Sequence, residues 1–115
     1  MSHECIFCKI AEGKIPAKII YQDTDIVAFH DINPQAPVHF LIIPRKHLKN
    51  LLDVKDVDAY VLAKMLMVAS DIARQLNIAN EGYRVVINTN RQAGQSVDHF
   101  HIHVLGGRIM EWPPG

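Results

Sequence analysis

The sequence predicts an α+β fold, in which a mostly antiparallel sheet is combined with separate helices. The chain has 115 residues, 49% of them hydrophobic, which suits one packed core and excludes a disordered chain. Five short runs of β-branched and aromatic residues are present, and two segments show helical spacing of apolar residues. Short strands in succession with helices set apart are typical of α+β folds. No repeat or Gly/Ser-rich linker divides the chain, so we expect a single domain over residues 1–115.

A short helix and a hairpin are expected at the start of the chain. Apolar residues within 5–12 recur with helical spacing, and Gly13 follows them, a residue suited to the left-handed conformation at a helix end. Residues 17–21 and 26–30 are strand-forming runs separated by a polar turn. This arrangement predicts two antiparallel strands directly after the helix.

A buried strand, a long helix and two further strands are expected next. Residues 39–44 form an apolar run typical of a buried strand, and residues 56–76 keep helical spacing for five turns. Met67 adds an apolar group outside a narrow stripe, which fits either ordinary core packing or the interface of a homodimer. The runs at 83–89 and 99–105 predict the last two strands.

Charge and cysteine content exclude several classes of protein. Twelve Lys and Arg residues balance twelve Asp and Glu residues, so we expect no basic surface for nucleic acid. No apolar run approaches the roughly 20 residues of a membrane span, and the N-terminus shows no signal pattern. The only cysteines, Cys5 and Cys8, cannot form a secreted disulfide framework. We therefore expect a cytoplasmic protein that binds neither nucleic acid nor membrane.

Three of the seven histidines, namely His99, His101 and His103, alternate with apolar residues within five positions. Alternate side chains of an extended strand share one face, so the three imidazoles are expected on one surface. The residues alone leave three interpretations open. The cluster fits the polar face of a half-exposed strand, a metal site on His-x-His spacing, or a nucleophilic site with a tautomer fixed by a neighbour.

The segment from Gln95 to Leu105 resembles the signature of the histidine triad (HIT) superfamily. The chain looks most like its HINT branch, the histidine triad nucleotide-binding proteins. Further similar motifs lie at residues 15–20, 28–32, 34–37, 39–44, 94–97, 106–108 and 112–115. The resemblance implies a HIT fold with about five strands, one long and one short helix, and a homodimer in which Trp112 lies near the partner's active site. Asp98 departs from the pattern, since an aromatic residue is expected there, and this change is expected to affect the pocket rim.

The resemblance also implies a purine nucleoside phosphoramidase, which hydrolyses AMP or GMP joined through phosphorus to an amine. His101 would attack the phosphorus and carry the nucleotidyl group until water removes it. For this, Nδ1 of His101 must donate to a fixed acceptor, and we expect a backbone carbonyl of the same region in that role. Ser96 would give a proton to the departing amine, and His39 would orient the site. Dinucleoside polyphosphate hydrolysis, nucleotidyl transfer and a nucleotide-binding interaction module stay open as alternatives.

The nucleotide contacts follow from the same resemblance. Asp31 would accept hydrogen bonds from the ribose hydroxyls. The donors to the phosphoryl oxygens would be Asn88, Ser96, His103 and the backbone amide of Gly94 or Gln95. The purine slot would be formed by Ile6, Phe7, Ile10, Phe29 and Ile32. Without the resemblance, these five apolar residues are better explained as core. No Mg²⁺ site is expected.

Cys5 and Cys8 have the Cys-x-x-Cys spacing that lets two thiolates bind one ion, but two ligands alone are a weak signal. Some branches of the superfamily complete such a site with the histidine of a Pro-x-x-His element and the first triad histidine. Those positions correspond to His47 and His99, so the resemblance implies a structural Zn²⁺ held by these four residues. Reduced cysteines without a metal, and a redox dithiol, stay open as alternatives.

Overall fold

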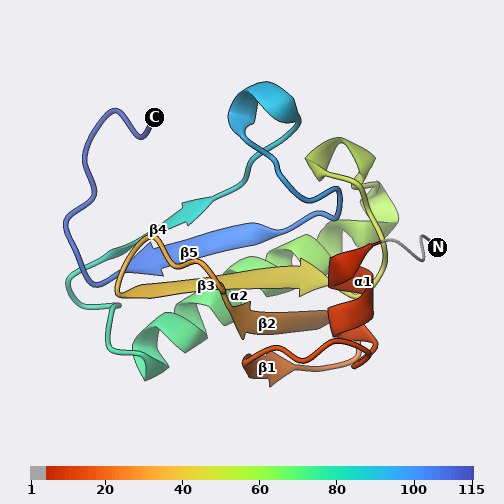
Figure 1. The fold of residues 1–115 in the computed structure, drawn as a ribbon, viewed down its shortest axis with the longest axis horizontal. Coiled ribbons are helices and arrows are strands. Elements are labelled where there is room, and N and C mark those ends of the chain that lie inside the picture. The colour runs from red at the N-terminus through yellow and green to blue at the C-terminus, as the bar shows by residue number, and fades with distance from the viewer. Residues whose placement is uncertain (1–4) are drawn as a thin grey trace.

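The computed structural model describes residues 5–115, which form a five-stranded antiparallel sheet with one long and one short helix (Figure 1). Along the sheet the strands follow the order β1-β2-β3-β5-β4. The elements are α1 (Ile6–Ala11), β1 (Ile19–Gln22), β2 (Ile26–His30), β3 (Val38–Pro44), α2 (Ala59–Gln75), β4 (Tyr83–Val86) and β5 (Ile102–Gly106). Short 3₁₀ turns lie at Leu51–Asp53, Asp56–Asp58 and Arg91–Ala93. The predicted α+β architecture is confirmed.

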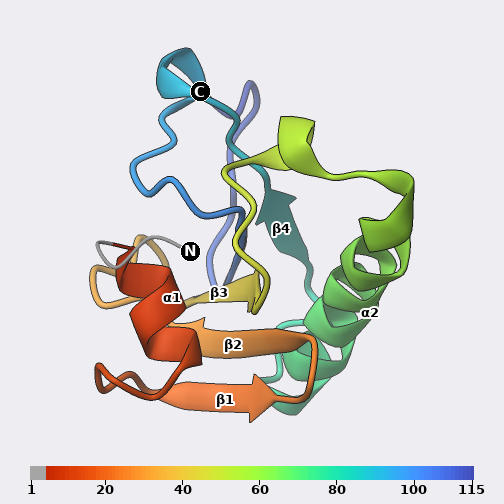
Figure 2. The ribbon, with the colours of Figure 1, turned by 90° about the vertical axis from the view of Figure 1, so that its right-hand side faces the viewer.

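The two helices cover opposite faces of the sheet, as Figure 2 shows. On one face, α2 contributes Met65, Ala69, Ile72 and Ala73 to the main core, together with alternate residues of β2, β3 and β5. On the other face, α1 packs Phe7 and Ala11 against the intervening residues of β2 and β3. Burial on both faces explains why residues 26–29 and 40–43 read as continuous apolar runs. The face that carries α1 also carries a cavity, and most of the candidate site residues line it.

The structure shortens the last strand, which was expected to begin at His99. β5 begins at Ile102, so His99 and His101 lie in the irregular segment before it. The cause is a change of backbone partner, because the Phe100 amide donates to the Leu48 carbonyl at 2.6 Å, outside the ladder. The expected alternation still holds in this segment. Phe100 joins the core under α2, while the rings of His99 and His101 pack against Phe7 of α1.

Other predicted boundaries also differ, including that of β1, which begins at Ile19 and not at residue 17. The strand expected at 83–89 ends at Val86, and the long helix begins at Ala59 after the 3₁₀ turn. Asp58 explains the later helix start, because its carboxylate accepts from the Lys55 amide and pairs with Lys46 at the turn. Within residues 5–115, no helix combines the length and apolar character needed to cross a membrane.

The segment after β5 packs against the loop that joins β2 to β3. Gly107 has a φ of +91°, and a Cβ at this residue would lie 2.9 Å from the ring of Pro37. The close approach and the left-handed backbone together require glycine here. Next to it, Nε of Arg108 donates to the carbonyl of Gln35 at 3.1 Å. The C-terminal segment therefore holds the loop of residues 34–37 in place.

Candidate functional site

A cavity of about 1020 Å³ opens on the α1 face of the sheet. It lies between α1, the end of β2, the loop of residues 31–37 and the segment that carries the histidines. The predicted catalytic and nucleotide-binding residues that line it are Ile6, Phe7, Ile10, Phe29, Asp31, Ile32, His39, Ser96, His101 and His103. Its lining combines apolar side chains of α1 and β2 with Asp31, Ser96 and four of the histidines. The cavity thus offers an apolar slot next to convergent hydrogen-bonding groups.

His101 is held with one ring nitrogen engaged. Its Nδ1 lies 2.7 Å from the carbonyl oxygen of His99, a group that can only accept, so Nδ1 carries the proton and Nε2 bears the lone pair. The side chain is buried, and Phe7 packs edge-on against the ring with centroids 5.2 Å apart. Burial lowers the pKa of His101, which favours the neutral ring. A neutral imidazole with a fixed lone pair is a competent nucleophile.

A second group of polar side chains adjoins His101. The rings of His101 and His103 have centroids 5.0 Å apart, and Nδ1 of His103 lies 2.9 Å from Nε2 of His39. The carboxylate of Asp31 lies 3.3 Å from the same nitrogen of His39. Burial lowers the pKa of His39, an effect that Asp31 opposes, and burial next to His101 and His39 lowers the pKa of His103 to about 4. The backbone amide of Gln35 donates to Nδ1 of His39 at 3.0 Å.

Three of the predicted nucleotide contacts do not line the cavity, namely Asn88, Gly94 and Gln95. The amide of Gly94 donates to the Arg91 carbonyl, and that of Gln95 donates to the Asn90 carbonyl. The side chain of Gln95 bridges the Asn90 amide and the Val97 carbonyl, so it braces the loop. Both amides therefore donate within the loop. One of them was expected to be free to donate to the phosphoryl group.

The lining of the cavity also differs from the expectation at Asp98 and at Lys18. Asp98, which was expected at the rim, is exposed and does not line the cavity. Lys18 does line it and is the one Lys or Arg among the lining residues that the structure describes. Its position in an ordinary strand-forming run carries no signal of such a role. Only the pairing of the chain beside β2 brings Lys18 to the cavity, where the His30 amide donates to its carbonyl.

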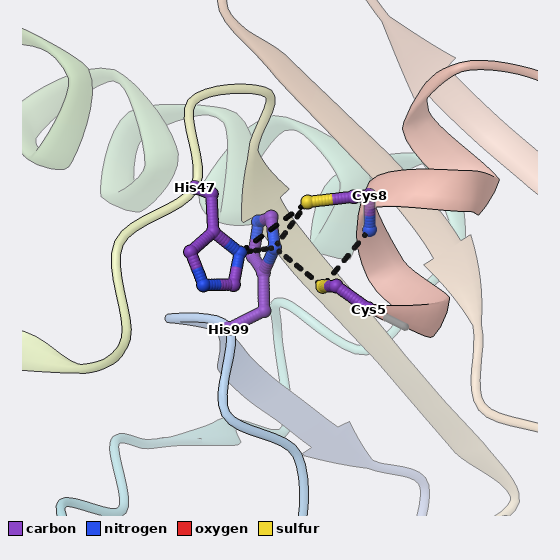
Figure 3. A group of neighbouring side chains, drawn as sticks. All are labelled: Cys5, Cys8, His47 and His99. Carbon is purple, nitrogen blue, oxygen red and sulfur yellow. Dashed lines mark hydrogen bonds between the residues drawn. The ribbon is translucent and has the colours of Figure 1, made fainter. Parts of the chain in front are cut away.

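A separate cluster of Cys5, Cys8, His47 and His99 lies beside the cavity (Figure 3). The start of α1 supplies both cysteines, the loop after β3 supplies His47, and the segment before β5 supplies His99. One ligand atom from each residue lies within 4.8 Å of every other. Nδ1 of His99 is 3.2 Å from the sulfur of Cys5, 3.5 Å from that of Cys8 and 3.2 Å from Nδ1 of His47. These four residues could hold one metal ion.

The hydrogen-bond chemistry of this cluster favours a cation at its centre. Nε2 of His99 lies 2.8 Å from the carbonyl of Pro44, so this nitrogen carries the proton and Nδ1 has a single lone pair. That lone pair cannot serve three neighbours at once. A tetrahedral ion with Zn–S near 2.3 Å and Zn–N near 2.0–2.1 Å places its ligand atoms about 3.3–3.8 Å apart, close to the spacing seen here. A carbonyl partner on the far nitrogen is also the usual support of a metal-bound histidine.

The thiols fit the same interpretation. Burial and the adjacent Cys5 raise the pKa of the Cys8 thiol to about 11, so two thiolates side by side are unfavourable without a compensating charge. The sulfur of Cys5 also accepts from the Cys8 amide at 3.2 Å, a hydrogen bond that a thiolate strengthens. A divalent cation would supply the missing charge. Nε2 of His101 is not part of this cluster, so a metal here would leave that nitrogen free.

Comparison with known proteins finds similar sequences and similar structures. Residues 12–110 match the HIT domain family. A HIT-like protein of Synechococcus elongatus, described as uncharacterized, is 48% identical over 115 residues that span all of both chains. The crystal structure of a HIT family hydrolase from Legionella pneumophila matches with a TM-score of 0.95 and 51% identity, covering 97% of this chain and 100% of that one. A histidine triad protein from Clostridium difficile matches with a TM-score of 0.92 and 38% identity over 96% of each chain.

Proposed function

Because this chain belongs to the HIT domain family and has the fold of a HIT family hydrolase, we propose that it hydrolyses purine nucleoside 5′-phosphoramidates, as a member of the HINT branch. The observation that carries the proposal is the state of His101. Its Nδ1 is bound to a carbonyl while its Nε2 faces a cavity of nucleotide size. This geometry supports attack on the phosphorus of an AMP- or GMP-amine conjugate and a nucleotidyl intermediate on His101.

The rest of the cavity fits a purine nucleotide. The purine would lie among Ile6, Phe7, Ile10 and Phe29, and the exposed Ile32 would close over it. Asp31 would accept from the ribose hydroxyls, which a carboxylate can do with both oxygens. His103 lines the cavity next to His101 and would donate to a non-bridging phosphoryl oxygen as charge gathers there. We expect no Mg²⁺ to bind in this arrangement.

The reaction has two steps in which atoms and protons balance. In the first, Nε2 of His101 forms a bond to phosphorus while the phosphorus–amine bond breaks, and the hydroxyl of Ser96 passes a proton to the departing amine while it takes another from solvent. This transfer matters because an amide anion is a very poor leaving group. In the second, water attacks phosphorus and loses a proton to solvent through Ser96, and the bond to His101 breaks. The nucleotide leaves and the neutral ring is restored.

The test compares substrates and traps the intermediate. His101→Ala is expected to bind AMP with little change and to lose turnover of an AMP-amine conjugate. In the wild-type protein, rapid quenching and mass spectrometry should find an added AMP on the peptide that contains His101. His30→Ala removes a histidine of the cavity rim and should still form the adduct. Retained turnover in His101→Ala would refute the mechanism. Faster turnover of a dinucleoside polyphosphate would favour that alternative, and no turnover of either would favour an interaction module.

For the cysteine and histidine cluster we propose a structural zinc ion held by Cys5, Cys8, His47 and His99. The four ligand atoms lie within 4.8 Å of one another, and four of their separations are 3.2–3.5 Å, close to those around a tetrahedral ion, which supports this choice. Zinc in such a site joins segments of the chain and takes no part in the chemistry at His101. Zinc-binding thiols must stay reduced, which fits the cytoplasmic location that we also propose.

We further propose that the protein is a homodimer formed through β4 and the adjacent surface of α2. β4 is an edge strand that pairs only with β5 among the described residues, and Ser70 of α2 contacts Tyr83 of β4 at 2.8 Å. Met67 of α2 is 70% exposed and lies three residues before Ser70, so it adds an apolar side chain to the same side of the helix. Light scattering should give a dimer for the wild type and a monomer for Met67→Glu. A second exposed apolar residue, Leu52, provides the control Leu52→Glu, and a monomeric wild type at micromolar concentration would refute the dimer.

A further inference from the structure

Two clusters that contain histidines lie side by side in this protein. They differ in the backbone group that hydrogen-bonds to the second ring nitrogen, and this difference indicates different functions. Besides the group around His99, the ligand atoms of Asp31, His39 and His103 lie within 4.8 Å of one another. By residue type and distance alone, this second group also resembles a metal site. The partner on the far nitrogen differs, since a carbonyl faces His99 whereas a backbone amide faces His39.

The amide of Gln35 leaves His39 one possible protonation state. It donates to Nδ1 of His39 at 3.0 Å, so this nitrogen must offer its lone pair. A proton on Nδ1 would face the amide proton, and this excludes both the other neutral tautomer and the doubly protonated ring. Burial, which lowers the pKa of His39, favours the neutral ring as well. His39 therefore carries its proton on Nε2.

The tautomer of His39 in turn determines the tautomer of His103. The proton on Nε2 of His39 points to Nδ1 of His103 at 2.9 Å, and the Asp31 carboxylate lies farther away at 3.3 Å. Accepting this proton, Nδ1 of His103 must be the nitrogen without one. The neutral ring of His103 then carries its proton on Nε2, which makes no hydrogen bond to the residues that the structure describes. His103 lines the cavity beside His101, so this N–H is available to a phosphoryl oxygen.

We infer that the backbone amide of Gln35 sets the tautomers of His39 and, through it, of His103, so that His103 presents an N–H donor to the phosphoryl group. Gln35 is a positioning residue, acting through its peptide N–H and not through its side chain. The function of the donor rests on the phosphoramidase proposal, but the assignment of the tautomers does not. The inference also predicts that Asp31, His39 and His103 do not bind a metal, because a metal on Nε2 of His39 would need the proton on Nδ1.

The peptide that performs this task is held from both sides. Arg108 donates to the carbonyl of Gln35, and the Gln35 side chain donates to the Asn33 carbonyl at 3.1 Å. Pro34 precedes the residue, and Pro37 packs against Gly107. Restricted residues and a contact from the C-terminal segment thus keep the amide aimed at His39. The loop of residues 34–37 thus acts through its backbone, by positioning the amide of Gln35.

The first experiment measures the tautomers in the wild-type protein. Long-range ¹H–¹⁵N correlation spectra of the imidazole rings should show protons on Nε2 of His39 and His103 and on Nδ1 of His101. Scalar couplings across the hydrogen bonds should join the Gln35 amide nitrogen to Nδ1 of His39, and Nε2 of His39 to Nδ1 of His103. A proton on Nδ1 of either His39 or His103 would overturn the inference.

The second experiment removes the N–H alone. Gln35→Pro lacks the amide proton, whereas Gln35→Ala keeps it and serves as the matched control. The two rings in Gln35→Pro should lose their single tautomer, and those in Gln35→Ala should keep it. For adduct formation from an AMP-amine conjugate, the rate should fall about tenfold in Gln35→Pro with KM nearly unchanged, a loss below the roughly 10²–10³-fold seen when a transition-state donor is removed outright. Equal tautomers and rates in the two variants would overturn the inference.

The outcomes separate this inference from the proposed function. If the wild type does not turn over phosphoramidates, the function fails, and the ring spectra still decide whether Gln35 sets the tautomers. If Gln35→Pro does not fold, the couplings in the wild type decide alone. Zinc titration adds an independent result, since one equivalent is expected at the cysteine cluster and none at Asp31, His39 and His103. A second equivalent that removes the ring signals of His39 would contradict the assignment.

Discussion

The affinity for zinc should rise steeply with pH, because the ligand cysteines must lose their protons to bind. The pKa of the buried Cys8 thiol is about 11 in the metal-free fold, so this thiol is protonated throughout the range from pH 6.5 to 8.5. Metal binding therefore releases the proton of Cys8. Each released proton contributes a tenfold gain in apparent affinity per pH unit. We expect the logarithm of the affinity to rise with pH with a slope of at least one.

The gain in folding stability from the metal can be estimated from the affinities of structural zinc sites. Structural zinc sites in small peptides have apparent binding free energies of about 10–16 kcal/mol near pH 7. At the lower end, roughly 10 µM free zinc exceeds the dissociation constant by about 200-fold and stabilises the fold by about 3 kcal/mol. For a domain of this size, that corresponds to a rise in Tm of roughly 12 °C. The gain should be larger at higher pH.

Competition with a chromophoric chelator at several pH values measures the slope, and calorimetry with and without zinc measures the shift in Tm. Cys8→Ser should lower both the affinity and the slope, since one thiol proton is no longer released. His30→Ala leaves the four ligands intact and should behave as the wild type does. Cobalt in place of zinc should give the absorption of a tetrahedral site with sulfur ligands. A pH-independent affinity, or an equal Tm with and without metal, would refute the assignment of these four residues.

Two further predictions concern stability. Burial lowers the folded-state pKa of His101 and takes that of His103 to about 4, against about 6.5 in the unfolded chain. Between these values the unfolded state binds more protons, so the free energy of unfolding should be largest above pH 6.5 and fall as the pH drops toward 4. Urea unfolding at pH 7.5 and 5, with a chelator present to exclude metal loss, should show this fall, and equal stability would contradict it. In Gly106→Ala the new Cβ would lie 2.7 Å from Cδ1 and 2.9 Å from Cβ of Ile78. The free energy of unfolding should therefore fall by about 1–3 kcal/mol. The double variant with Ile78→Val, which removes Cδ1, should recover part of this loss.

Much of the fold is legible in the sequence because its signals are local. Helical spacing marks α2, the polar turn marks the hairpin of β1 and β2, and Gly13 with a φ of +75° ends α1 as expected. The start of β5 was predicted wrongly because its determinant is not local. The Phe100 amide bonds to Leu48, 52 positions earlier in the chain, and no pattern around residue 100 reveals that partner.

The site divides in the same way. Side chains with distinctive chemistry, such as those of His101 and Cys5, are visible in the sequence, and the structure brings them into two adjacent clusters. Backbone groups leave no such trace. Nothing in the residue type of Gln35 indicates that its amide meets His39, and nothing at Gly94 indicates that its amide is already engaged. These assignments need the folded chain, because every residue other than proline carries the same N–H.

His99 divides its work between side chain and main chain. Its imidazole belongs to the cysteine cluster, while its carbonyl accepts from Nδ1 of His101, the proposed nucleophile. A carbonyl is present whatever the side chain, so a variant with another residue at position 99 can lose the metal and still orient the nucleophile if the segment keeps its course. The first histidine of the three is thus open to replacement without a change of chemistry. An engineer can redesign the metal cluster and the reaction separately, although the two are joined at one residue.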